Sequence, residues 1–266
     1  MMRIAAVVVA FGLAMLAGPG AAGAQGQPAA TATPAATAGC PGNPDALGTA
    51  RVMKVATTGG FEVGTKFYPS TLPLGPREIV LTFDDGPFGT TTDKVLKALA
   101  DECVKATFFV IGRNAAARPD QLKRIAAAGH TVAHHSMTHP VLRELPFDAA
   151  TADMRAGWQA VDRVLYGTAG EAPRTPFFRY PGFAQSKQLT AWLAARNVGV
   201  FAADFWGSDW NPSTPEALLA QVLSRAEQHG GGIMLLHDIH AHTAAMVGPM
   251  LREFKRRGFR IVHMVP

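Results

Sequence analysis

From Glu78 onward the chain alternates short apolar runs with longer amphipathic segments, and this alternation constrains the fold more than any other feature. The apolar runs predict strands at 78–83, 106–111, 130–133, 177–179, 198–202, 232–236 and 260–263. The segments between them predict helices at 91–101, 119–128, 147–166, 187–196, 215–229 and 244–257. Repeated strand–helix units are typical of a parallel sheet with helices outside. We therefore expect an α/β fold, a distorted (β/α) barrel with about seven parallel strands, with a doubly wound open sheet as the alternative.

The first 24 residues have the pattern of a secretory signal peptide. Met1-Met2-Arg3 precedes an apolar run from Ile4 to Ala17, and small residues ending in Ala22-Gly23-Ala24 follow it. These are a charged start, an apolar centre and a cleavage motif. The run is short for a membrane anchor, so we expect cleavage and export to the periplasm or the extracellular space. The later apolar runs are short and interrupted by charge, so we expect no membrane span.

Two segments separate this leader from the predicted barrel. Residues 25–39 contain only Ala, Thr, Pro, Gly and Gln, and this uncharged composition predicts a disordered tether. Residues 40–76 predict an irregular extension packed on the barrel, with a hairpin-like patch around Val52–Val63. Residues 77–266 make up the main domain.

The chain has two cysteines, Cys40 and Cys103. Export favours oxidation of such a pair, so we predict a disulfide between the extension and the barrel wall, with two unpaired thiols as the alternative. The formal net charge of +5 is a mild excess spread along the chain. Nucleic-acid-binding proteins concentrate basic residues on one face or helix, so we expect no nucleic-acid partner. We expect a monomer.

Polar residues follow the carboxyl ends of the predicted strands, the end at which barrels carry their active sites. These residues are Asp84-Asp85, His134-His135, Arg179, residues 204–209 and His237-Asp238. Unrelated surface loops are the alternative, but they do not account for so regular a placement. Adjacent acids such as Asp84 and Asp85 make sense when one binds a metal and the other handles a proton.

His135 and His139 are spaced i and i+4, which on a helical turn puts both imidazoles on one face. Together with Asp85 they form a set of three ligands that leaves a position open, the composition of a catalytic zinc site. Asp84 then suits a base, and Arg179 suits a partner that keeps it ionised and oriented. His237 suits a general acid that Asp209 keeps protonated. The alternatives are a structural ion pair for Arg179, a strand-capping histidine for His237 and an ordinary loop acid for Asp209.

With these residues assembled, the chain from about Arg77 to the C-terminus resembles the polysaccharide deacetylases of carbohydrate esterase family 4, the NodB-homology group. The motifs, in the family's order, are Thr82-Phe83-Asp84-Asp85-Gly86-Pro87, His135-Ser136-Met137-Thr138-His139-Pro140, Arg179-Tyr180-Pro181-Gly182, Asp209-Trp210 and Leu235-Leu236-His237. The resemblance implies Asp84 as base, Asp85, His135 and His139 as metal ligands, and His237 as acid. It further implies Gly182 as an oxyanion donor, Trp210 in the cleft wall and Leu235 in the acetyl pocket. One departure is Pro181-Gly182-Phe183, where the family commonly has Pro-Tyr-Gly.

We therefore expect residues 77–266 to be a metal-dependent catalytic domain that uses Zn²⁺ to remove acetyl groups from a glycan containing N-acetylglucosamine. An O-acetyl esterase with the same ligands is the nearest alternative. A non-catalytic glycan-binding module is a third hypothesis, although such a module is expected to lack the base, a ligand or the acid. A serine hydrolase is disfavoured because the sequence has no Gly-x-Ser-x-Gly motif.

Overall fold

The computed structural model describes residues 29–34 and 40–266, so the predicted signal peptide and much of the predicted tether lie outside the described residues. The strands are β1 (Ala30–Pro34), β2 (Thr49–Val55), β3 (Phe61–Val63), β4 (Glu78–Asp84), β5 (Thr107–Val110), β6 (Thr131–His134), β7 (Phe177–Phe178), β8 (Gly199–Phe201), β9 (Phe205–Trp206), β10 (Gly232–His237) and β11 (Arg260–Val265). The helices are α1 (Gly89–Asp101), α2 (Gly112–Ala117), α3 (Pro119–Ala127), α4 (Phe147–Tyr166), α5 (Lys187–Ala194), α6 (Pro215–His229) and α7 (Ala241–Arg256).

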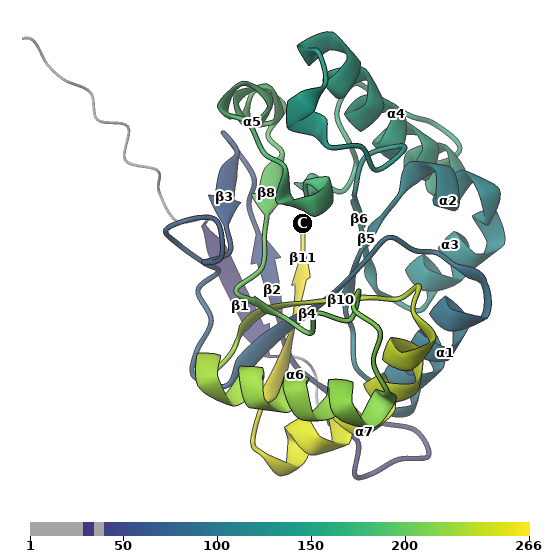
Figure 1. The fold of residues 1–266 in the computed structure, drawn as a ribbon, viewed down its shortest axis with the longest axis vertical. Helices are drawn as coiled ribbons and strands as arrows, with labels where there is room; N and C mark the ends of the chain where they lie inside the picture. The colour runs from purple at the N-terminus through teal and green to yellow at the C-terminus, as the bar shows by residue number, and fades with distance from the viewer. Residues whose placement is uncertain (1–28, 35–39) are drawn as a thin grey trace, which may run out of the picture.

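The strands form one curved sheet in which every described pairing is parallel except that of β1 with β2. Their order is β1-β2-β11-β4-β5-β6-β7-β8-β3, and β10 lies between β4 and β9. Helices flank most of this sheet, from α5 at the top of Figure 1 round to α6 and α7 at the bottom, and β1, β2 and β3 lie along its left side. The fold is thus the expected α/β barrel type, although hydrogen bonds between the described strands do not close it into a ring.

The centre of the barrel is built on β4, because all seven of its residues are buried. Side chains of a strand point alternately to its two faces. Val80 accordingly joins an inner apolar cluster with Phe109 and Phe201, whereas Leu81 and Phe83 join the larger cluster that includes residues of α1, α6 and α7. A strand covered on both faces reads as a continuous apolar run, which is why β4 stood out in the sequence.

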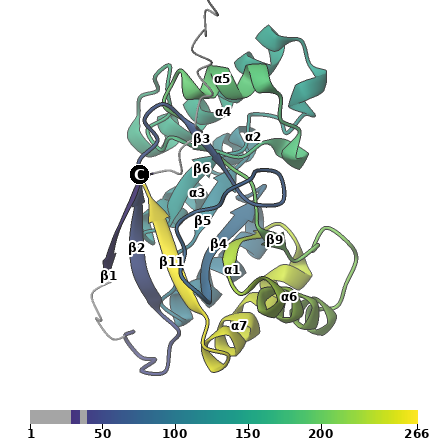
Figure 2. The same cartoon turned by 90° about the vertical axis from the view of Figure 1, so that its left-hand side faces the viewer.

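The predicted hairpin around Val52–Val63 is wrong. β2 and β3 do not pair with each other: β2 lies parallel to β11, and β3 lies parallel to β8. Figure 2 shows β1, β2 and β11 side by side along one border of the sheet. Two apolar segments close in sequence suggested a hairpin, but each finds a partner more than 130 residues away.

The segment predicted as a disordered tether contains strand β1, and the prediction is corrected for these residues. Ala30–Pro34 pairs antiparallel with Val55–Arg51 of β2. The composition of this segment cannot supply a core, but backbone pairing along an edge strand does not require one. Residues 25–28 and 35–39 lie outside the described part of the chain.

The structure contains the disulfide predicted between Cys40 and Cys103, with 5.6 Å between the Cα atoms. Hydrogen bonds reinforce this attachment beside the end of α1. The Asn43 side chain donates to Asp101 O at 2.8 Å, and the backbone of Leu47 donates to the Glu102 carboxylate at 3.0 Å. The extension is therefore fastened to the barrel wall at its start.

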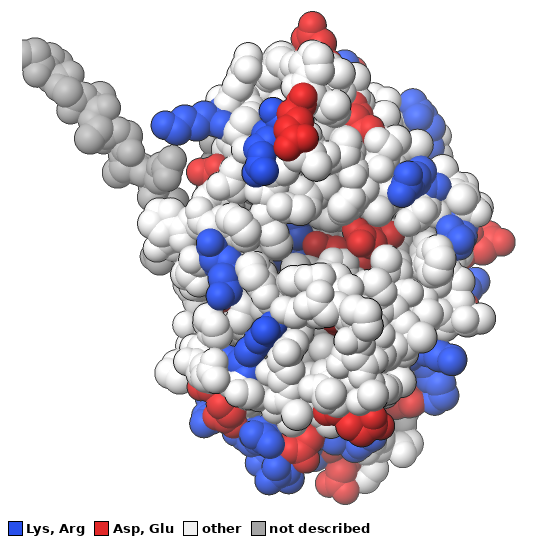
Figure 3. All heavy atoms as spheres, in the orientation of Figure 1, with Lys and Arg blue, Asp and Glu red and all other residues white. Residues whose placement is uncertain are grey.

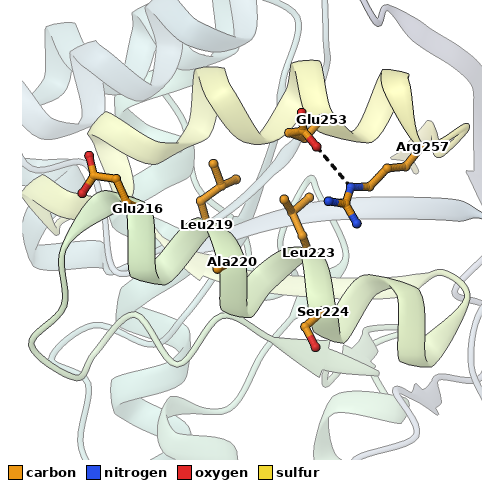
Figure 4. A pocket seen from close by; sticks show the side chains of 7 residues that line it. All are labelled: Glu216, Leu219, Ala220, Leu223, Ser224, Glu253 and Arg257. Carbon is orange, nitrogen blue, oxygen red and sulfur yellow. Dashed lines mark hydrogen bonds and ion pairs between the residues drawn. The ribbon is translucent and has the colours of Figure 1, made fainter.

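Helices α4 and α6 have the predicted limits, and the others differ by a few residues. α6 begins where the sequence predicts, since the Thr214 side chain accepts a hydrogen bond from Ala217 N. A pocket of about 450 Å³ lies between α6 and α7. Figure 4 shows the side chains that line it, among which Glu253 accepts a hydrogen bond from Arg257 at 3.2 Å. Helix α2 and strand β9 were missed, because each is too short for a periodic pattern.

Candidate active site

The polar residues predicted to meet at the carboxyl ends of the strands do lie together. Parallel register places His237 of β10 opposite Asp84 of β4, and β6 ends at His134, just before His135. Figure 3 shows acidic side chains within a recess on the face presented in Figure 1. A cavity of about 390 Å³ is lined by Asp84, Asp85, His135, His139, Tyr180, Gly182, Phe183, Trp206, Trp210, Leu235 and His237.

Asp85, His135 and His139 form the single cluster of three metal-ligating side chains within the described residues. Asp85 Oδ1 lies 3.5 Å from His135 Nε2 and 3.4 Å from His139 Nε2. Two ligand atoms about 2.1 Å from a zinc ion, at tetrahedral angles, lie roughly 3.4 Å apart. Asp85 Oδ1 is also buried without a hydrogen-bond partner among the described residues, so the spacing and the chemistry of these atoms both fit a divalent ion.

The tautomer of His135 is set by the backbone of Arg179. His135 Nδ1 lies 2.8 Å from Arg179 O. A carbonyl oxygen can only accept, so Nδ1 carries the proton, and the lone pair of Nε2 faces Asp85 and His139. Burial lowers the pKa of the fully buried His135, which keeps this ring neutral and able to bind a metal.

His135 and His139 do not lie on a helical turn, contrary to the prediction from their spacing. The segment after β6 is a loop, with positive φ angles of 65° at Ser136 and 63° at His139. Asp153 of α4 holds this loop. Its Oδ1 accepts from Met137 N at 2.9 Å, and its Oδ2 accepts from the Thr138 hydroxyl at 2.6 Å. Side-chain hydrogen bonds therefore bring the two imidazoles together, with ring centroids 5.0 Å apart.

Arg179 is fully buried and directly contacts Asp84. Its Nη1 donates to Asp84 Oδ1 at 2.7 Å. Its Nε donates to Phe201 O at 3.0 Å, and its Nη2 donates to Ala202 O at 2.9 Å. The ring of Phe109 packs against the guanidinium, with 4.1 Å between the Arg179 Cζ atom and the ring centroid. The guanidinium is thus fixed from several sides, and Asp84 Oδ2 is left facing His135 Nε2 at 3.7 Å.

His237 and Asp209 form the second charged pair. His237 Nδ1 lies 2.9 Å from Asp209 Oδ1, and His237 N donates to Asp209 Oδ2 at 2.7 Å. Burial lowers the pKa of His237, but the hydrogen bond and negative charge of Asp209 outweigh it and raise this pKa to about 9. The imidazole is consequently protonated at neutral pH, and its Nε2 lies 4.0 Å from Asp85 Oδ2.

The three residues predicted to contact substrate also line the cavity. Gly182 lies in a 3₁₀ turn (Pro181–Phe183) with φ of 55°, a conformation that glycine adopts readily. Leu235 is buried in β10. Trp210 is 45% exposed, and its ring stands perpendicular to that of His237 at 5.8 Å.

Asp238 is a buried residue next to the site whose role was not predicted. Thr92 Oγ1 donates to its Oδ2 at 2.5 Å, and burial raises the pKa of Asp238 to about 7. The carboxyl group packs against Gly86, where any Cβ atom would collide with it. This contact explains why the residue after Asp85 is glycine. The sequence signal for a role of Asp238 was its position directly after His237.

Comparison with known proteins decides the family. A peptidoglycan-N-acetylglucosamine deacetylase of Bacillus cereus is 30% identical over 199 residues, covering 73% of this chain and 70% of that protein. The chain belongs to the polysaccharide deacetylase family. The family model described as polysaccharide deacetylase matches residues 72–202, so Asp209, Trp210, Leu235 and His237 lie beyond the matched range.

Other relatives of this polysaccharide deacetylase family member are also named as deacetylases. A chitooligosaccharide deacetylase of Sinorhizobium fredii is 36% identical over 181 residues, covering 64% of this chain and 78% of that protein. A solved peptidoglycan deacetylase of Bdellovibrio bacteriovorus has a TM-score of 0.71 at 37% identity, covering 80% of this chain and 58% of that one. The chain spans 42% of the length of the Listeria monocytogenes peptidoglycan-N-acetylglucosamine deacetylase, to which it is 33% identical over 210 residues.

Among the helices of residues 40–266, none combines the length and the apolar character that a bilayer crossing requires.

Proposed function

We propose that this protein is a metal-dependent deacetylase that removes acetyl groups from polysaccharides or oligosaccharides containing N-acetylglucosamine, of the chitooligosaccharide or peptidoglycan type. The observation that carries the proposal is a triad of metal-ligating side chains flanked by a carboxylate and by a protonated imidazole. Hydrolysis of an amide needs these groups, because water must lose a proton and the departing nitrogen must gain one. Relatives named for deacetylation of peptidoglycan and chitooligosaccharides support the same substrate class.

Asp85, His135 and His139 would hold the metal. One carboxylate and two imidazoles are the ligands of hydrolytic zinc sites, so we expect Zn²⁺. When bound, such an ion supplies Lewis-acid polarisation of the acetyl carbonyl and makes water more acidic. The hydrogen bond from His135 Nδ1 to Arg179 O maintains the ligating tautomer.

Asp84 would act as the base. Its Oδ2 points toward the metal triad, while its Oδ1 is held by Arg179 at 2.7 Å. The hydrogen bond from Arg179 to Oδ1 would fix the orientation of the whole carboxylate. Oδ2 would then accept a proton from the attacking water. Arg179 pairs with Asp84, the buried member of the two adjacent acids, and so works as a positioning residue.

His237 would act as the acid that protonates the departing nitrogen, and Asp209 would keep it charged until that step. The backbone N–H of Gly182 would donate to the developing oxyanion. Leu235 would contact the acetyl methyl group at the cavity floor, and Trp210 would form the wall on which the sugar lies.

The test is release of acetate from β-1,4-linked N-acetylglucosamine oligomers by the Asp84→Asn variant. We expect kcat/KM to fall roughly 10²–10⁴-fold, the usual contribution of a positioned base, while the zinc content stays that of the native protein. Asp93→Asn is a matched control, because Asp93 is an acid on α1 paired with Arg124 outside the cavity. Native rates in Asp84→Asn would contradict the assignment of the base.

An O-acetyl esterase would use the same ligands. The protonated His237 favours an amide substrate, because an amine leaves only after its nitrogen is protonated. Acetate release from an acetylated xylan, measured beside the N-acetylglucosamine oligomers, separates the two reactions. Glycan binding and bound metal without turnover would instead favour a non-catalytic binding module.

We also propose that residues 77–266 form the catalytic domain, that residues 40–76 are an extension packed on it, and that the protein acts as an exported monomer. The leader-like first 24 residues and the disulfide support export to an oxidising compartment. The N-terminal mass of the protein recovered outside the cytoplasm tests the cleavage, and light scattering after gel filtration tests the oligomeric state.

A further inference from the structure

Four aromatic rings form a strip that leads from His237 out of the cavity. The Trp210 ring lies 5.7 Å from Trp206, which lies 6.0 Å from Phe183. Phe183 stacks on Phe67 at 4.5 Å, and Phe67 also lies 6.3 Å from Trp206. Trp210 is 45% exposed and Phe67 is 40% exposed, so the strip presents apolar ring surface at both of its ends.

Phe67 belongs to the N-terminal extension and precedes the residues matched by the family model, which begin at 72. It is nevertheless held rigidly. Phe67 N donates to Gly64 O at 3.0 Å, and Gly64 N donates to Ser70 O at 2.9 Å, which closes a tight loop. A Cβ at Gly64 would lie 2.6 Å from the backbone of Ala202, so this loop presses directly on the segment after β8.

Asp204 fastens the same loop to the barrel. The buried carboxylate accepts from Thr65 N at 2.7 Å and from the Thr65 hydroxyl at 2.9 Å through one oxygen. The other oxygen accepts from the Thr71 hydroxyl at 2.5 Å and from Ile233 N at 2.6 Å. Because Ile233 is the second residue of β10, Asp204 connects the loop that carries Phe67 to the strand that carries His237.

Phe183, an interior ring of the strip, also has a fixed conformation. Phe183 has a φ of 55°, a left-handed conformation that is unfavourable for an aromatic residue. Phe183 N donates to Tyr180 O at 2.9 Å and maintains this turn. The turn stacks the Phe183 ring on Phe67, and the same ring packs against the apolar cluster that contains Tyr180 and Leu189. The Lys66 ammonium covers Trp206 at 5.0 Å from the ring centroid, which leaves the outer rings as the accessible ones.

We propose that this strip is an accessory sugar subsite, in which Phe67 contacts a ring of the glycan beyond the sugar that carries the acetyl group. A pyranose ring has an apolar C–H face, and a large exposed aromatic ring next to a binding cavity is a surface suited to cover it. The strip is continuous with Trp210 in the cavity wall, so a chain held there extends directly over Phe183 and Phe67. The inference rests on the proposed function for the identity of the glycan.

The subsite predicts a preference for longer glycans. On this proposal, a disaccharide occupies the catalytic cavity without covering Phe67, whereas a hexasaccharide is long enough to lie over it. In Phe67→Ala we expect the ratio of kcat/KM for the hexamer to kcat/KM for the dimer of β-1,4-linked N-acetylglucosamine to fall about tenfold, the effect of losing one aromatic contact. Phe67→Tyr retains the ring and is expected to retain the native ratio.

Tyr166→Ala is the matched control, because Tyr166 is a 47% exposed aromatic residue at the end of α4, where its ring is covered by Arg174. This control is expected to leave both rates unchanged. An unaltered hexamer-to-dimer ratio in Phe67→Ala would overturn the subsite. A thermal unfolding scan checks that Phe67→Ala is folded. We expect it to be, because Phe67 is 40% exposed.

A binding measurement separates failure of this inference from failure of the proposed function. Calorimetry with the same dimer and hexamer, in an Asp84→Asn background in which we expect turnover to be slowed, measures binding at the subsite separately from catalysis. Tighter binding of the hexamer that is lost in Phe67→Ala supports the subsite even if the native protein releases no acetate. Equal affinities of the dimer and the hexamer would overturn it even if deacetylation is confirmed.

Discussion

The charge of Asp209 should set the upper pH limit of the reaction. The pKa of His237 is about 9, against an ordinary value near 6.5. One pKa unit corresponds to about 1.36 kcal/mol, so the surroundings of His237, Asp209 above all, stabilise its protonated form by about 3 kcal/mol. The side chain of His237 is only 14% exposed, so solvent screens this interaction little.

Asp209→Asn removes the charge but keeps the shape. Burial of His237, the largest effect on its pKa, is then opposed only by the charges of Asp84 and Asp85, and we expect the pKa to fall back to about 6.5. At pH 7.5 the protonated fraction falls from about 97% to less than about 10%. The acid form exists only below the pKa, so the alkaline fall of kcat/KM should move from near pH 9 to below pH 7.

The assay is the pH profile of kcat/KM for acetate release from N-acetylglucosamine oligomers. Thr243→Val is the matched control, since Thr243 donates to the same carboxylate at 2.7 Å without contributing a charge. Its alkaline limit should stay near that of the native protein. A limit that remains near pH 9 in Asp209→Asn would refute the assignment of His237 as an acid maintained by Asp209.

Two further predictions concern metal binding and stability. Asp153→Ala releases the loop that carries His139, so zinc affinity should fall roughly 10–100-fold, as measured by competition with a chromogenic chelator. Asp148→Ala, in the exposed first turn of the same helix, should leave that affinity unchanged. Reduction of the Cys40–Cys103 disulfide, which spans 63 positions, should lower the free energy of unfolding by about 4 kcal/mol. An unaltered urea midpoint after reduction would contradict this estimate.

The parts of the fold that sequence predicts are those dictated by local periodicity. The limits of α4 and α6 follow from helical spacing and end signals such as Thr214. The strands from β4 onward, apart from the two-residue β9, follow from short apolar runs, of which β4 is buried along its whole length. Because parallel strands end at a common edge, the placement of Asp84 and His237 near one another followed from the same reasoning.

The errors concern interactions between distant residues. Spacing alone placed His135 and His139 on a helical turn, whereas a carboxylate on α4 shapes their loop. The partners of β2 and β3 are set by which sheet edges remain unpaired, and local sequence does not carry that information. The position of Phe67 beside Phe183 depends on the same long-range packing.

The attachment of the loop at residues 64–71 determines where the protein can be shortened. A chain cut at residue 72, where recognisable family similarity begins, would remove β2 and β3 and leave the edges of β11 and β8 open to other strands. It would also strip the interior carboxylate of Asp204 of its donors from Thr65 and Thr71. Burial of an anion without its partners lowers the free energy of unfolding by several kcal/mol. This amount is comparable with the whole stability of a domain. The minimal folding unit of this protein therefore begins well before its family signature, and such a shortened chain should aggregate.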